Sequence, residues 1–145
     1  MANGVYNRAK YMLADGTLDL PTTADLRVLL VKSTYTFDPD HNFVSDVIAG
    51  SQEISVGGYS RQALANETIT EDDANDFAYL DADDSVFTSL ASGQTIGGAV
   101  VYKFNAADAS AEVIAFYDTT DTLTNGGNVT IQWNTPANGG VLKLA

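Results

Sequence analysis

A chain of 145 residues has the length of one domain, and its 45% content of hydrophobic residues is enough for a buried core, which excludes wholesale disorder. Seven Lys and Arg against nineteen Asp and Glu give a net charge of −12, which disfavours direct binding to nucleic acid and to anionic lipid headgroups. The absence of cysteine excludes disulfides and thiolate metal sites, and no stretch approaches the roughly 20 apolar residues of a membrane helix, so neither nucleic acid nor membrane is an expected partner.

The first predicted element is a short helix over residues 5–14, within an N-terminal segment of residues 1–16. Its apolar residues recur at i, i+4, i+7 and i+8 and form one stripe, made of Val5, Ala9, Met12 and Leu13. Asn3 is expected to cap the helix and Gly16 to end it. Because ten residues are marginal for an isolated helix, the stripe must dock, either on the chain's own core or on a neighbouring subunit. The second alternative makes the segment a docking arm and the four stripe residues a partner-binding site.

The next elements point to a protein built mainly from strands. The nearly continuous apolar run of residues 26–32 predicts a strand buried on both faces, and Phe43, Val47 and Ile48 fit one face of a two-turn helix. Short strand-like segments separated by turn residues follow at residues 53–56, 60–65, 67–70, 77–81 and 85–90. Turn signals at such close intervals are typical of an all-β sandwich or barrel.

The strongest strand signals are two adjacent runs rich in Val, Ile, Phe and Tyr, at residues 96–104 and 111–118. They predict an antiparallel hairpin near the centre of a sheet, because both faces of both strands are largely apolar. Alternation places Val113 and Ala115 on one face of the second strand and Ile114 and Phe116 on the other.

The C-terminal part is expected to contain a loop over residues 119–127 and two more strands, at residues 129–134 and 141–145. The first of these strands alternates cleanly, with Val129, Ile131 and Trp133 pointing inward. The whole pattern predicts a mainly β fold: an antiparallel β-sandwich or jelly-roll-like single domain spanning residues 1–145, with a short N-terminal helix.

Residues that carry catalysis are scarce in this sequence. His41 is the only histidine, it lies in a predicted turn, and no Gly-x-Ser-x-Gly motif accompanies it. Glycine pairs such as Gly97-Gly98 match no phosphate-binding motif and are expected at turns and bulges, where positive φ is required. We therefore expect no enzymatic activity and no cofactor.

Two weak binding signals remain in the loops. Asp81, Asp83 and Asp84 offer oxygen ligands for calcium, but Asp also favours solvated turns, and the EF-hand pattern is not matched. Tyr35 and Tyr59 lie in loop-like sequence, where exposed aromatic rings would suit a carbohydrate- or receptor-binding module.

The order of several motifs carries a resemblance to a known group of proteins. These motifs are Met1-Ala-Asn-Gly-Val-Tyr-Asn7, Leu13-Ala-Asp-Gly-Thr-Leu-Asp-Leu20, Asp25-Leu-Arg-Val-Leu-Leu-Val31, Val100-Val-Tyr-Lys103, Val113-Ile-Ala-Phe-Tyr-Asp118, Asn125-Gly-Gly-Asn-Val-Thr-Ile-Gln-Trp133 and Gly140-Val-Leu-Lys-Leu144. Together they resemble the small structural proteins of tailed bacteriophages that are encoded among head and tail genes. The likeness is one of layout and strand motifs, and it is weakest over residues 38–92.

The resemblance implies a virion protein without defined site residues. Within that group a compact acidic β domain suits a capsid decoration, or cement, protein that is made in the host cytoplasm and stabilises the outer surface of the head shell. Its implied partners are the major capsid protein and copies of itself, often as a homotrimer in proteins of this kind. A tail, collar, baseplate or head-fibre component is the alternative position.

Overall fold

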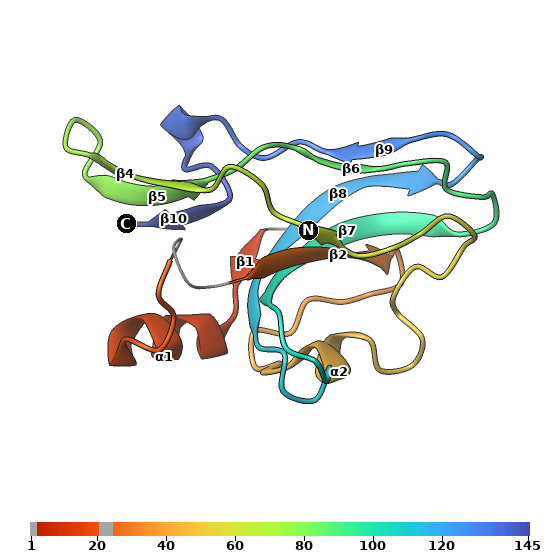
Figure 1. The fold of residues 1–145 in the computed structure, drawn as a ribbon, viewed down its shortest axis with the longest axis horizontal. Helices are drawn as coiled ribbons and strands as arrows, with labels where there is room; N and C mark the ends of the chain where they lie inside the picture. The colour runs from red at the N-terminus through yellow and green to blue at the C-terminus, as the bar shows by residue number, and fades with distance from the viewer. Residues whose placement is uncertain (1–2, 21–24) are drawn as a thin grey trace.

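The computed structural model describes residues 3–20 and 25–145 (Figure 1). Within these residues the elements are, in chain order, β1 (Gly4–Val5), α1 (Asn7–Asp15), β2 (Leu26–Lys32), α2 (Val44–Val47), β3 (Gln62–Ala63), β4 (Thr68–Asp72), β5 (Phe77–Asp81), β6 (Ser85–Phe87), β7 (Thr95–Lys103), β8 (Val113–Leu123), β9 (Val129–Ile131), the 3-10 helix η1 (Pro136–Asn138) and β10 (Leu142–Leu144). The fold is mainly β and antiparallel, with one short helix near its start, which confirms the predicted class.

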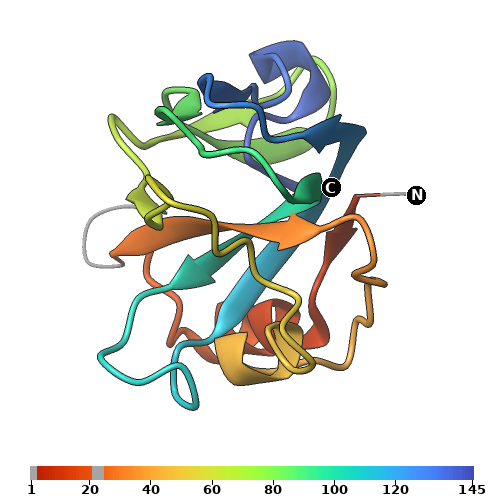
Figure 2. The same ribbon diagram turned by 90° about the vertical axis from the view of Figure 1, so that its right-hand side faces the viewer.

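Three antiparallel sheets organise the molecule. The central sheet has the strand order β1-β8-β7-β2-β3, and the two smaller sheets have the orders β10-β5-β4 and β6-β9. Both small sheets lie on one side of the central sheet, whereas α1 and α2 lie toward its other side (Figures 1 and 2). The predicted central hairpin is confirmed as β7 paired with β8.

Strands β2 and β7 are buried on both faces because their alternate residues enter two different cores. Val28 pairs with Val101 toward the small sheets, and the next pair, Leu29 with Val100, points to the opposite side. The larger core fills the space between the sheets and is closed by residues of α1, while the smaller core packs beneath α2. Both cores share the central sheet, so the described residues form a single domain.

A β-bulge changes the face assignment expected for β8. Val101 pairs with Ala115 while the adjacent Tyr102 pairs with Val113, so Ile114 is an extra residue in the ladder. As a result Val113 joins the core beneath α2, whereas Ile114 and Ala115 both contribute to the larger core. The prediction that Val113 and Ala115 share a face was therefore wrong, because apolar residues on both faces hide a one-residue shift.

The N-terminal helix is shorter than predicted. It begins at Asn7 with Tyr6 as its N-cap, and Val5 belongs to β1, which pairs with β8. The extended conformation of Tyr6, whose backbone N–H donates to the carbonyl of Ile114, ends that strand and starts the helix. Gly16 ends the helix in a left-handed conformation at φ +79°, as expected. Residues 1–2 of the predicted segment lie outside the described residues.

Other predicted boundaries were only partly right. Strand β5 has the bounds that were predicted, but β8 continues to Leu123 through residues assigned to a loop. Residues 53–56 form only an isolated bridge, between Glu53 and Val31, and β9 ends at Ile131. Gly97 and Gly98 lie inside β7 beside an irregular pairing and have no positive φ; there is no room for a Cβ atom at either position.

Candidate interaction surface

The apolar stripe of the N-terminal segment packs within the chain itself. Ala9 and Met12 are fully buried in the larger core, and Val5 and Leu13 are partly buried against it. The exposed aromatic residue of α1 is Tyr11, which is 58% exposed and lies 5.4 Å from the guanidinium of Arg8. Contact between the stripe and a partner stays a prediction. Of the four stripe residues, only Val5 and Leu13 have exposed atoms that could make such a contact.

Two of the three acidic residues considered for calcium, Asp83 and Asp84, form hydrogen bonds within the chain. The Asp83 carboxylate accepts a hydrogen bond of 2.6 Å from the side-chain amide of Asn66, and Asp84 accepts one of 3.1 Å from the backbone N–H of Trp133. The indole N–H of Trp133 donates to the carbonyl of Asp83 over 3.0 Å. Among residues 3–20 and 25–145, no group of three or more His, Asp or Glu side chains is arranged to hold a metal ion, and this applies to Asp81 as well.

The two loop tyrosines do not form an exposed platform for a sugar. Tyr35 is only 4% exposed, and its hydroxyl lies within hydrogen-bond distance of the Tyr6 hydroxyl, at 2.9 Å, and of His41 Nδ1, at 3.2 Å. The Tyr59 hydroxyl accepts from the backbone N–H of Leu30 and donates to Glu53. Burial raises the pKa of both tyrosines, which keeps the hydroxyls neutral.

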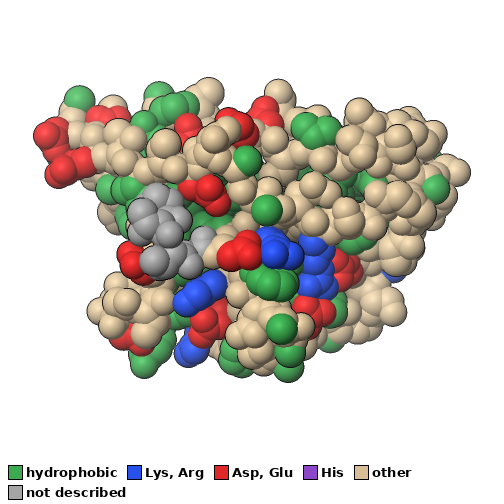
Figure 3. All heavy atoms as spheres, viewed as in Figure 1, with side chains coloured by type: hydrophobic (Ala, Val, Ile, Leu, Met, Phe, Trp, Pro, Cys, Tyr) green, Lys and Arg blue, Asp and Glu red, His purple; other side chains and the backbone are tan. Residues whose placement is uncertain are grey.

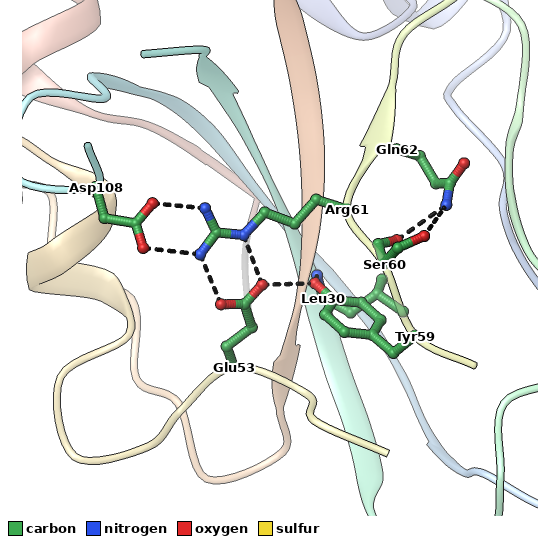
Figure 4. Close-up of polar contacts among 7 residues, drawn as sticks. All are labelled: Leu30, Glu53, Tyr59, Ser60, Arg61, Gln62 and Asp108. Carbon is green, nitrogen blue, oxygen red and sulfur yellow. Dashed lines mark hydrogen bonds and ion pairs between the residues drawn. The ribbon is translucent and has the colours of Figure 1, made fainter. Parts of the chain in front are cut away.

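An ionic cluster centred on Arg61 joins three segments of the chain (Figure 4). The Arg61 guanidinium donates to both carboxylate oxygens of Glu53, at 2.7 Å each, and to both of Asp108, at 2.6 and 3.1 Å. These hydrogen bonds hold the pKa of the Asp108 carboxyl below its usual value. The cluster fastens the loop between β7 and β8 to the edge of the central sheet. Because both carboxylates are paired with the guanidinium, we interpret it as a structural clamp.

An acidic hairpin, defined as residues 67–84 with strands β4 and β5, is the surface that we consider as a binding site. It contains eight acidic residues and no Lys or Arg, so these 18 residues carry eight of the twelve net negative charges. Asp and Glu side chains gather at this end of the molecule, whereas Lys and Arg lie over its middle (Figure 3). Strand β4 is an outer strand of its sheet and is exposed over its first four residues.

An open groove of about 780 Å³ runs along this hairpin. Its lining combines apolar and acidic side chains, namely Ile69, Glu71, Asp72, Asp73, Asp76, Phe77 and Ala78. Ile69 is 48% exposed there. A lining that combines apolar and acidic side chains suits a partner segment that contains both apolar and basic residues.

Two features of the structure were not predicted from the sequence, the Arg61 cluster and the position of the acidic hairpin. The Arg61 cluster joins residues 8 and 47 positions apart, and no local pattern signals such a pairing. The acidic hairpin did have a signal, the absence of Lys and Arg over residues 67–84, but its place at a sheet edge depends on tertiary structure.

No described helix is long and apolar enough to cross a membrane.

Comparisons with known proteins identify no relatives. No protein-family model, curated protein or solved structure matches the chain.

Proposed function

We propose that this chain is a non-enzymatic structural protein of a tailed-bacteriophage virion, which binds the outer surface of the head shell as a decoration protein. The observation that carries the proposal is the exposed edge of β4, which lies in the acidic hairpin. An edge of this kind is an adhesive feature, since its unpaired backbone groups bind another chain without any catalytic residue.

The motifs behind the phage resemblance support the proposal through their place in the fold. They cover most of β2 and β8, the end of β7, and the strands β9 and β10. The likeness therefore concerns the framework of the domain. The acidic hairpin lies in the part where the likeness is weakest, as expected for a surface that adapts to one particular partner.

The physics of a shell favours a small domain with a modest interface. A head presents many identical sites, and a protein that contacts more than one of them gains effective concentration from the first contact. A net charge of −12 limits self-association in solution and adsorption to packaged or free nucleic acid. Both properties suit a protein added late to an assembled head.

The test is binding to isolated heads of the source phage that were assembled without this protein. Purified full-length chain is mixed with heads and with tails in separate tubes, and bound copies are counted after sedimentation. We expect saturable binding of many copies per head and a higher temperature of DNA release from the decorated heads. Binding to tails alone, or to neither particle, would contradict the proposal.

A further inference from the structure

The direction of the backbone groups along β4 follows from the pairing on either side of β5. Val141 donates its N–H to the carbonyl of Leu80 over 2.7 Å, so the Leu80 backbone faces β10. In the β4–β5 ladder Leu80 is paired with Ile69, and this must be a non-hydrogen-bonded pair because the Leu80 groups point the other way. The N–H and C=O groups of Ile69 therefore point away from β5, and by alternation those of Glu71 do too.

These outward groups have no hydrogen-bond partner among the described residues. Strand β4 thus presents two donors and two acceptors with the spacing of a strand edge. An added strand of about five residues satisfies all four groups.

The side chains beside this edge specify the chemistry of such a strand. Ile69 and Glu71 share the face of the sheet that carries Leu80, because directly paired residues lie on the same face. A residue placed next to Ile69 meets a half-exposed apolar side chain, and one placed next to Glu71 meets a carboxylate. Asp72, the last residue of β4, and Asp73, which follows it, also line the groove.

The charge also decides against a second copy of the same edge. Two acidic hairpins placed edge to edge would bring eight negative charges against eight, and like charges directly opposite each other destabilise a strand pair. A segment rich in Lys or Arg gains from the same field, both in affinity and in the rate of encounter.

We propose that the outer edge of β4 binds an extended basic segment of a partner protein as an additional strand. Its apolar residues contact Ile69, and its Lys or Arg residues pair with Glu71, Asp72 and Asp73. If the chain is a decoration protein, as proposed above, this segment belongs to the head shell. The head-shell contact is then made by a basic, extended segment of the shell protein.

The direct test uses the full-length chain and a labelled ten-residue peptide that repeats Val-Thr-Lys-Lys, in which a Val and a Lys two residues apart lie on the same face of a strand, as Ile69 and Glu71 do. A peptide that repeats Val-Thr-Glu-Glu is the control. Fluorescence anisotropy gives the affinity, and hydrogen exchange followed by NMR gives the protection of individual amides. We expect the basic peptide alone to bind, more weakly at high salt, and to slow exchange at the amides of Ile69 and Glu71.

Two variants at one position separate backbone pairing from side-chain contact. Ile69→Pro removes an outward N–H and leaves every charge in place, whereas Ile69→Ala removes the same apolar side chain and keeps the N–H. A lost hydrogen bond predicts about tenfold weaker peptide binding for Ile69→Pro than for Ile69→Ala. Circular dichroism checks that both variants are folded. The exchange measurement on the parent protein tests the pairing even if Ile69→Pro does not fold.

Equal affinity of the two folded variants, or unchanged exchange at Ile69 and Glu71 in the peptide complex, would overturn the strand proposal. The same variants tested on heads keep the two proposals apart. If Ile69→Pro binds heads as well as Ile69→Ala does, the chain is a head-binding protein that does not use this edge. Peptide binding at β4 without any binding to heads supports the strand proposal and removes the decoration function.

Discussion

Trp133→Ala tests the packing that joins the small sheets to the central sheet. Trp133 is 8% exposed and belongs to the larger core, and its ring meets that of Tyr117 edge-on with centroids 5.0 Å apart. Its indole N–H also donates to the carbonyl of Asp83. Removing the side chain leaves a cavity beside Tyr117 and leaves the Asp83 carbonyl without this hydrogen bond.

We expect Trp133→Ala to lower the free energy of unfolding by about 3–5 kcal/mol, the usual cost of truncating a buried Trp. For a domain of this size that corresponds to a melting temperature lower by about 10 °C. The matched control is Trp133→Phe, which keeps an aromatic ring but loses the N–H donor. It should cost only about 1–2 kcal/mol.

Urea unfolding followed by far-ultraviolet circular dichroism is the suitable assay. Trp133 is the only tryptophan, so its fluorescence is lost in both variants. A Trp133→Ala protein that unfolds within 1 kcal/mol of the parent would refute the assignment of this residue to the core. Equal losses in the Ala and Phe variants would instead show that the hydrogen bond to Asp83 dominates.

Three further predictions concern the clamp and the central hairpin. Arg61→Met should lower the free energy of unfolding by about 2 kcal/mol, measured by urea unfolding at pH 7, because it leaves two half-buried carboxylates without their cation. Arg61 lowers the pKa of Asp108, so the stability that this pair contributes is present at neutral pH and is lost as the pH falls below about 4. The melting temperatures of the parent and of Arg61→Met should therefore converge in acid. A difference that stays constant with pH would contradict the pairing. Gly98→Ala should cost about 1–3 kcal/mol in thermal unfolding because the new Cβ would lie 2.5 Å from the Phe116 ring, whereas Gly57→Ala, whose nearest contact is 3.6 Å, should be close to neutral.

The parts of the fold that the sequence predicted well are those with strong local patterns. The apolar run of β2, the central hairpin and the bounds of β5 all follow from composition and period. The bulge at Ile114 was hidden because both faces of β8 are apolar, so a one-residue shift leaves the pattern unchanged. The end of β8 at Leu123 was missed because its last residues are polar and exposed, although pairing with β7 keeps them extended.

The candidate surface shows a similar division between local and tertiary information. The Asp and Glu residues within 67–84 were visible in the sequence, where they were interpreted as solvated turns, with calcium binding as the alternative. The binding proposal rests on β4 being an outer strand of the sheet β10-β5-β4, and this arrangement depends on the C-terminal strand returning to pair with β5. No pattern within the hairpin contains that information.

The most direct test of the proposed function is immunogold labelling of intact virions of the source phage with antibody to this chain. The account predicts gold particles distributed over the whole head surface at high copy number. Labelling confined to the tail or its tip would contradict it and would place the same β domain in the tail, where host contact becomes the next question.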